Sequence, residues 1–271
     1  MNLPNFAPVS VIIPCYKSGG TIRRAIASIM SQSLLPAEII IVDDASSDAS
    51  LDILNEMVGN NPTVIKLICL STNVGAASAR NAGWAASTQT YIAFLDSDDA
   101  WHPDKLKVQY QYMVANPDVC LSGHGHRILN IEQSPDWTIG ETIAISLPKW
   151  QILLSNRFVT PSAMVRRDIA ERFLDGQRYM EDHMLWLSIV CSGKSVSKLS
   201  LDLVALYKPE FGSNGLSARI WLMERGELAN YWRVYKNNWI NTFLFLLLVL
   251  LSCAKYLRRL LMYWGYLRWR A

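Results

Sequence analysis

The segment Tyr91-Ile-Ala-Phe-Leu-Asp-Ser-Asp-Asp99 decides the fold class of this chain. Its first half is apolar and its second half is acidic, which is typical of a buried strand that ends in a polar loop. The same arrangement occurs earlier, where Ile39-Ile-Ile-Val42 runs into Asp43-Asp44. Buried strands with acidic ends favour a parallel sheet, and such a sheet binds its ligands beyond the carboxyl ends of the strands.

The rest of the first hundred residues alternates between strand and helix patterns. Further strands are predicted at Val9-Ser-Val-Ile-Ile-Pro14 and at 64–70. Helices are predicted from Thr21, over 50–58 and over 76–86, because apolar or small residues recur there at helical spacing. We therefore expect an α/β fold with a mostly parallel sheet flanked by helices, in which both acidic clusters share one crevice.

Beyond residue 100 the pattern is less regular. A helix is predicted over 103–115, and short strands mix with loops over 119–160. A second helix is predicted over 178–192, and its first part contains Glu181 and Asp182. No internal repeat or low-complexity linker divides the chain.

The composition excludes several classes of protein. The chain has 271 residues, 51% of them hydrophobic, which suits one full domain with an appendage. Its formal net charge of +3 does not indicate a nucleic-acid-binding protein. The five cysteines include no Cys-x-x-Cys pair, so we expect a reducing compartment rather than a disulfide framework or zinc site. Residues Met1–Ser10 lack a basic patch and an apolar run, so we expect no secretory signal and a cytoplasmic catalytic body.

Asp96 and Asp98 are the first candidates for chemistry. Two carboxylates two residues apart at a strand end point the same way. Hard oxygen ligands of this kind suit Mg²⁺ or Mn²⁺, with water and substrate phosphates completing the shell. Taken alone, an Asp-rich turn is equally compatible with the N-cap of a following helix, and Asp99 could serve only that purpose.

Five segments together resemble the family 2 glycosyltransferases, which have the GT-A (Rossmann-like) fold. The resemblance covers residues 8–215 and implies an inverting enzyme that moves a single sugar from a nucleoside-diphosphate sugar to a hydroxyl of a glycan acceptor. The matching segments, in the family's order and spacing, are Val9-Ser-Val-Ile-Ile-Pro-Cys-Tyr16, Ile40-Ile-Val-Asp-Asp-Ala-Ser-Ser-Asp48, Asn73-Val-Gly-Ala-Ala-Ser-Ala-Arg-Asn-Ala-Gly83, Phe94-Leu-Asp-Ser-Asp-Asp99 and Glu181-Asp182.

The resemblance assigns the donor side of the site. It implies that Asp44 receives the N–H of the base ring and that Pro14 and Tyr16 form part of the nucleotide pocket. It also implies that Asp96 and Asp98 hold the ribose and the Mg²⁺ or Mn²⁺ ion that bridges the diphosphate.

The resemblance also implies that Asp182 is the catalytic base. A carboxylate in a first helical turn is otherwise a common cap, so this second interpretation stays open. Arg80 is expected to support the acidic crevice, although a helical arginine could equally pair with Asp43 or Asp96. Lys208 falls where relatives carry a loop that contacts phosphate, and the absence of a nearby histidine argues against a metal-binding histidine there.

The C-terminal tail has a different composition. After Glu227 the chain has no acidic residue, and the apolar run Trp239–Ala254 is shorter than the roughly 20 residues of a membrane-spanning helix. A span would also place the following basic residues outside the cell, against the positive-inside rule. We therefore favour one or two helices on the inner leaflet over a span, and packing on the catalytic domain or a second subunit is a third alternative. The basic residues are Lys255, Arg258, Arg259, Arg268 and Arg270.

These observations predict a catalytic domain over residues 1–220, with a nucleotide-binding half at about 8–118 and an acceptor half at about 119–220, followed by a helical, membrane-associated tail over 221–271. The expected acceptor is a glycan or lipid-linked glycan of bacterial surface polysaccharide synthesis, at the inner face of the cell membrane. One alternative is a polyprenyl-phosphate sugar synthase of the same fold, which needs a base such as Asp182 less. Another is an inactive nucleotide-binding scaffold.

Overall fold

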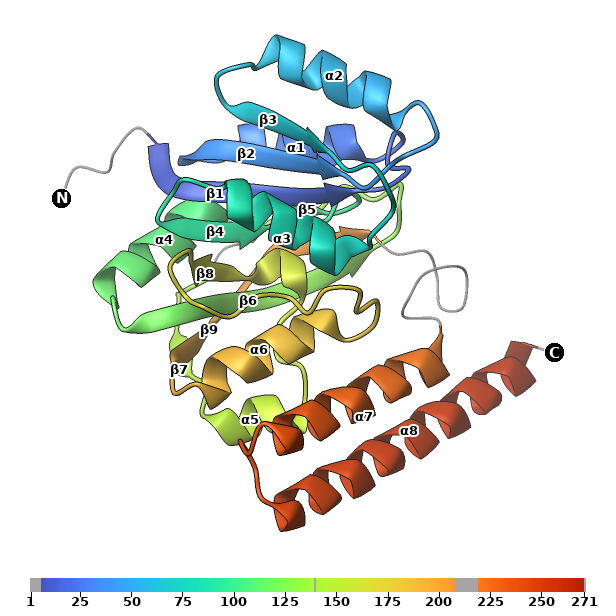
Figure 1. Cartoon of the computed structure of the whole chain (residues 1–271). Helices are drawn as coiled ribbons and strands as arrows, with labels where there is room; N and C mark the ends of the chain where they lie inside the picture. The colour runs from blue at the N-terminus through green and yellow to red at the C-terminus, as the bar shows by residue number, and fades with distance from the viewer. Residues whose placement is uncertain (1–5, 139, 208–218, 271) are drawn as a thin grey trace.

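The computed structural model describes residues 6–138, 140–207 and 219–270, with side chains described as far as Met262. One mixed sheet runs through this part of the molecule, and helices lie on both of its faces (Figure 1). The strands follow the order β3-β2-β1-β4-β8-β6-β9-β5, and β7 pairs with β9 outside this path. The predicted α/β class with helices flanking the sheet is confirmed.

The first four strands form a parallel region, as their continuous apolar runs predict. Successive residues of β1 point to opposite faces, so Ile13 packs with residues of α1 and Ile12 packs with residues of α3. Both faces of the sheet are therefore covered by apolar side chains. The elements of this region are β1 (Phe6–Cys15), α1 (Ile22–Met30), β2 (Leu35–Asp43), α2 (Ser50–Asn60), β3 (Ile65–Cys69), α3 (Ala76–Ala86) and β4 (Tyr91–Phe94).

Helix α3 occupies the residues predicted for it and lies unusually close to the sheet. A Cβ atom on Gly83 would lie 2.6 Å from Ile12 Cγ2, so the glycine is what permits this approach. The small residues Ala77 and Ala79 are likewise fully buried. The close contact places the buried side chain of Arg80 beside the carboxyl end of the sheet.

Antiparallel pairs connect the second half of the chain to this region. Strand β8 runs antiparallel to β4 and to β6, whereas β9 runs parallel to β6. The sheet is therefore less uniformly parallel than the sequence pattern suggested. The elements of this half are β5 (Ala100–Trp101), α4 (Lys105–Ala115), β6 (Val119–Leu129), β7 (Ala144–Ser146), α5 (Lys149–Leu154), a 3₁₀ turn (Thr160–Ser162), β8 (Met164–Arg166), α6 (Glu181–Cys191) and β9 (Ser195–Tyr207).

The tail forms an antiparallel pair of helices, α7 (Ile220–Lys236) and α8 (Thr242–Arg270) (Figure 1). Asn241 caps α8, because its Oδ1 accepts a hydrogen bond from the backbone N–H of Leu244 at 2.9 Å. The predicted helical tail is confirmed. In the part of the chain that the structure describes, no helix has both the length and the hydropathy that a membrane crossing requires.

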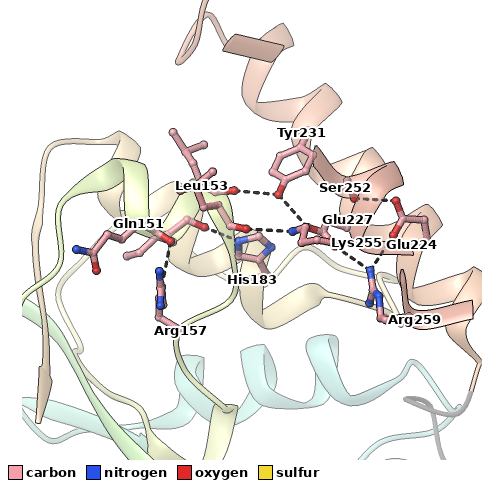
Figure 2. Close-up of polar contacts among 12 residues, drawn as sticks. Gln151, Leu153, Arg157, His183, Glu224, Glu227, Tyr231, Ser252, Lys255 and Arg259 are labelled. Carbon is pink, nitrogen blue, oxygen red and sulfur yellow. Dashed lines mark hydrogen bonds and ion pairs between the residues drawn. The ribbon is translucent and has the colours of Figure 1, made fainter. Parts of the chain in front are cut away.

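Ion pairs join the two tail helices along a seam, in which buried glutamates of α7 meet partly exposed basic side chains of α8 (Figure 2). Glu227 accepts a hydrogen bond from Lys255 Nζ at 2.6 Å. Glu224 accepts one from Ser252 Oγ at 2.7 Å and forms an ion pair with Arg259 at 2.9 Å. Two of the basic residues that the composition assigned to a membrane surface thus point inward, toward α7.

This seam leaves the opposite face of α8 apolar and exposed. The inward residues recur at spacings of three and four on both helices, so each helix presents one stripe to its neighbour. The stripe on α7 is Glu224, Glu227, Tyr231 and Val234, and that on α8 is Leu248, Ser252, Lys255 and Arg259. The exposed apolar residues of α8 are Phe243, Leu246, Leu247, Leu250, Leu251, Leu257, Leu261 and Met262.

Candidate active site

A cleft of about 390 Å³ opens at the carboxyl ends of β1, β2 and β4, beside the start of α6. The two acidic clusters of the sequence meet here, because parallel neighbouring strands end at the same edge of the sheet. Lys208 lies outside the described residues. All the other predicted site residues line this cleft: Pro14, Tyr16, Asp44, Arg80, Asp96, Asp98 and Asp182.

Asp44 is a buried carboxylate that organises the loop before α3. Its Oδ1 accepts a hydrogen bond from the N–H of Val74 at 2.7 Å, and its Oδ2 accepts one from the N–H of Gly75 at 2.8 Å. Each carboxylate oxygen can accept a further hydrogen bond, so both contacts leave Asp44 able to receive an N–H group of a bound nucleotide base. The exposed ring of Tyr16 lies at the same side of the cleft.

Arg80 bridges two acids across the cleft. Its guanidinium is 2.6 Å from Asp96 Oδ1 and 3.2 Å from Glu181 Oε1, and the side chain is only 4% exposed. Burial lowers the pKa of Arg80, but Asp96 and Glu181 outweigh burial and hold that pKa above its ordinary value. Of the two acids considered as partners from the sequence, Asp96 is the one that Arg80 contacts, and Glu181 is an additional partner.

Asp96 and Asp98 fit the requirements of a divalent cation. The Asp96 side chain is 31% exposed, and Asp98 is also exposed to solvent at the cleft. In the described ranges, no three His, Cys, Asp or Glu side chains form a complete metal-binding group. Mg²⁺ is commonly held by one or two carboxylates together with water and substrate phosphates, so two carboxylates at an open cleft suit it.

Asp182 is half-buried in the first turn of α6. Its Oδ2 accepts a hydrogen bond from Asn156 Nδ2 at 2.8 Å, and its Oδ1 accepts one from the N–H of His183 at 2.7 Å. Burial raises the pKa of Asp182 above the usual value, although both hydrogen bonds lower it. The contact with His183 satisfies a first-turn N–H, so the cap interpretation and the base interpretation are geometrically compatible.

Left-handed backbone conformations occur beside the cleft-lining residues. Lys17 (φ 52°), Ala45 (φ 57°) and Met180 (φ 56°) have a conformation that non-glycine residues rarely adopt. Such residues cost of order 1–3 kcal/mol each and cluster at functional sites. Met180 explains why α6 begins at Glu181 rather than at 178, because a left-handed residue cannot continue a helix.

Several cleft residues carry no signal in the local sequence. Asn156 follows α5 and reaches Asp182 only through the fold. Arg178 and Tyr179 come from the loop before α6, and Met223 comes from the tail helix α7. Because the sequence pattern predicts a helix from 178, it gives no sign of this loop. The only local signal for a loop is the polar, glycine-containing stretch at 175–178.

Comparison with known proteins agrees with this geometry. Residues 10–174 match the family described as Glycosyl transferase family 2. An uncharacterized glycosyltransferase of Haemophilus influenzae is 29% identical over 82% of this chain and 87% of its own length. The Escherichia coli protein named UDP-Glc:alpha-D-GlcNAc-diphosphoundecaprenol beta-1,3-glucosyltransferase WfgD is 31% identical over 67% of this chain and 69% of its own length.

Solved structures share the fold at low sequence identity. S. aureus TarS 1-349 in complex with UDP-GlcNAc has a TM-score of 0.63 and 21% identity, and the match covers 82% of this chain and 66% of that one. The mannosyltransferase PcManGT from Pyrobaculum calidifontis, in complex with GDP-Man and Mn2+, has a TM-score of 0.62 and 17% identity. That second match covers 85% of this chain and 65% of the other. These neighbours identify the fold as GT-A.

Proposed function

Because this chain belongs to glycosyl transferase family 2 and is a glycosyltransferase, we propose that it transfers one sugar, with inversion, from a nucleoside diphosphate to a hydroxyl of a lipid-linked glycan. The observation that carries this proposal is the convergence of Asp44, Asp96, Asp98 and Asp182 on one cleft. The first three acids suit the donor, and the fourth suits the acceptor hydroxyl.

On the donor side, Asp96 and Asp98 would hold Mg²⁺ or Mn²⁺. A bound divalent cation neutralises the charge that the leaving diphosphate gains. Arg80 holds Asp96 in place through its 2.6 Å ion pair and is itself fixed by Glu181. Tyr16 and Pro14 line the same side and would contact the nucleoside. These residues orient the donor before the bond to its diphosphate breaks.

On the acceptor side, Asp182 would remove the hydroxyl proton. The acceptor oxygen forms its bond to the anomeric carbon while the bond from that carbon to the diphosphate oxygen breaks. The proton passes to an Asp182 oxygen, and the electron pair leaves with the diphosphate. A positioned base contributes typically about 10²–10⁴-fold to such a step. Attack opposite the diphosphate inverts the anomeric centre, and one carboxylate suffices because no covalent intermediate forms.

A binding and turnover series tests the donor assignment. UDP-, GDP- and dTDP-sugars are titrated against the full chain with Mn²⁺, and turnover is then measured with and without EDTA. We expect Asp98→Ala to abolish turnover and to weaken binding of the nucleotide sugar while the protein stays folded. Full activity in excess EDTA contradicts the metal assignment, and no binding of any donor contradicts the proposed function itself.

The acceptor assignment rests on chemistry at Asp182. A polyprenyl-phosphate synthase has an acceptor that is already ionised, so it gains little from a catalytic base. The name of WfgD specifies a diphosphoundecaprenol-linked sugar as its acceptor, and a similar acceptor is proposed for this chain. Turnover with a sugar linked through a diphosphate to a lipid, and none with a bare polyprenyl phosphate, is the expected result.

A lipid-linked acceptor requires access to a membrane, and the exposed face of α8 suits that role. Phe243, Leu250 and Leu261 are 77%, 68% and 74% exposed there. An apolar helix face binds interfaces through buried apolar area, and the exposed Arg258 on α8 adds attraction to anionic lipids. We place this face on the inner leaflet of the cell membrane, where nucleotide sugars are available.

Vesicle binding tests the membrane assignment with the full chain. Leu250→Gln combined with Leu257→Gln should strongly reduce binding to phosphatidylglycerol vesicles. Ile128→Gln, at a position that is 65% exposed on β6, is the matched control and should bind like the unmodified protein. The ionic part of the binding should weaken as salt rises. Equal binding by all variants contradicts the assignment.

A further inference from the structure

A second cleft, of about 470 Å³, adjoins the active site. It lies between the loop 174–179 and helix α7. Arg178 and Tyr179 line both clefts, so the two spaces meet at these side chains. A molecule that reaches Asp182 from this direction passes along α7.

One face of α7 forms the floor of this second cleft. Its lining residues are spaced by three and four, which places them on one side of a helix. The small residue Gly226 allows the loop to approach, because a Cβ there would lie 2.9 Å from the carbonyl oxygen of Tyr179. Arg225 and Arg233 are eight residues apart, or about 12 Å along the helix. The lining residues of α7 are Leu222, Arg225, Gly226, Ala229 and Arg233.

Three arginines line the second cleft without carboxylate partners among the contacts described. Arg178 donates to Asn73 Oδ1 at 3.2 Å, and Arg233 donates to Gln177 Oε1 at 3.3 Å, so both contact neutral amides. Arg225 is exposed. The one acidic lining residue, Asp175, accepts a hydrogen bond from the side chain of Asn81.

This arrangement differs from the other arginine clusters of the chain. Arg80 is paired with Asp96 and Glu181, and Arg259 is paired with Glu224, whereas the arginines of the second cleft leave an excess of positive charge. Arginine guanidinium groups present several donors in a geometry that matches phosphate. The second cleft is therefore chemically suited to a group with two or more negative charges.

We propose that the second cleft binds the diphosphate of the lipid-linked acceptor and so directs its sugar hydroxyl toward Asp182. This inference rests on the proposed function for its acceptor. The opposite side of α7 carries α8, whose outer face is apolar. A diphosphate bound to Arg225 and Arg233 would therefore be separated from the outer face of α8 by the two tail helices, and the first part of its long lipid chain would extend past them to reach the bilayer. Arg178 connects this phosphate site to the donor cleft.

The test measures binding of a sugar-free probe, so that it does not depend on knowing the acceptor sugar. Farnesyl diphosphate is titrated against the full chain by calorimetry, with farnesol as the uncharged comparison. The variants are Arg225→Gln, Arg233→Gln and both together. Arg167→Gln is the matched control, because Arg167 is exposed and lines neither cleft. Donor nucleotide binding is measured for every variant.

The expected result is a loss of about tenfold in probe affinity for each arginine removed, since a charge-assisted hydrogen bond contributes that much. Farnesol should bind equally weakly to all variants. Arg167→Gln should match the unmodified protein, and nucleotide affinity should not change. Probe binding should weaken as the salt concentration rises.

Three results overturn the proposal. One is unchanged probe affinity in the double variant. Another is probe binding that is lost in Asp98→Ala but retained in the double variant, which places the diphosphate in the donor cleft. The third is that the double variant loses binding to phosphatidylglycerol vesicles as strongly as it loses binding to the probe, which makes the arginines a site for membrane lipid. If the unmodified protein binds no nucleotide, the proposed function is contradicted instead, and the probe titration can still be interpreted.

Discussion

Two clusters of carboxylates in this molecule differ in burial and in how they are neutralised. In the α7–α8 seam, Glu224 and Glu227 face Lys255 and Arg259, so two acids meet two cations. In the active-site cleft, the acids Asp96, Glu181 and Asp182 surround the single buried cation Arg80. The seam is closed by a neighbouring helix, whereas the cleft opens to solvent.

The pKa shifts follow this difference. Burial raises the pKa of Glu227, but hydrogen bonds from Lys255 and Tyr231 outweigh burial and hold it below the usual value. At Asp182 burial prevails and the pKa is raised. The pKa of Glu224 in the seam is also raised by burial, so the contrast is between Glu227 and Asp182 and does not extend to the whole seam. The cleft therefore keeps a carboxylate that costs stability, which is expected where a group is needed for chemistry.

The largest expected effect comes from Asp182→Asn. It keeps the shape of the side chain and removes the proposed base, so kcat should fall by roughly 10²-fold or more with donor affinity unchanged. A carboxyl group whose folded-state pKa is raised stabilises the fold only at pH values below its unfolded-state pKa. That contribution is lost as the pH rises through the folded-state pKa. The variant should therefore melt no lower than the unmodified protein at neutral pH. Retention of more than about a tenth of kcat would show that another residue takes the proton.

In the α7–α8 seam, we expect a substitution to lower stability and to leave catalysis unchanged. Lys255→Met leaves the buried Glu227 with the Tyr231 hydroxyl at 2.9 Å and with Arg259, at 3.6 Å, as its nearest described cation. Removing one partner of a buried pair is strongly destabilising, so we expect a loss of about 2–4 kcal/mol in denaturant unfolding. Donor affinity and kcat should persist at temperatures where the protein is folded. Arg258→Met, at an exposed position on the same helix, is the control. A loss no greater than that of the control contradicts the structural role of the seam.

The two clusters should also respond to pH in different ranges. In the proposed mechanism Asp182 must be ionised. Its pKa is raised above the usual aspartate value near 4, so kcat should fall about tenfold per pH unit below that raised pKa. The stability from Glu227 is present above the usual glutamate pKa near 4.3 and is lost as pH falls through its lower folded value. Activity should therefore fail at a higher pH than folding does. Coincident loss of kcat and of circular dichroism signal would contradict this separation.

The smallest expected effect concerns Asn156. Its hydrogen bond to Asp182 lowers the pKa of that carboxyl, so Asn156→Ala should raise it. A single hydrogen bond of this kind is worth about 0.5–1.5 kcal/mol, which shifts the acidic limb of the kcat profile upward by about one pH unit at most. At high pH, kcat should return to near the unmodified value. A uniform decrease at all pH values would indicate misplacement of Asp182 instead.

Local pattern predicted the elements that carry the donor site. The apolar runs before Asp44 and Asp96 predicted buried strands, and both acids line one cleft because parallel strands end together. The small residues of 76–86 likewise predicted α3 at its observed position. These features depend on residues that are close in sequence, so their spacing alone carries the information.

The C-terminal helical tail is an intermediate case. Its helical character and the lack of acidic residues after Glu227 were evident from the sequence. The direction of Lys255 and Arg259 was not, because it depends on Glu224 and Glu227 of another helix. The three-and-four spacing of these side chains is visible in the sequence, but it does not specify which stripe faces the partner.

The sequence by itself determined the parallel part of the sheet, its acidic edge and the meeting of Asp44 and Asp96 at one cleft, and the family resemblance added Asp182. Only the tertiary structure decided that Arg80 joins Asp96 to Glu181, and that Asn156 contacts Asp182. It alone placed three arginines around a second cleft. The physical reason is range: strand and helix patterns arise from neighbours along the chain, whereas these contacts join separate elements, and Arg80 and Glu181 are 101 residues apart.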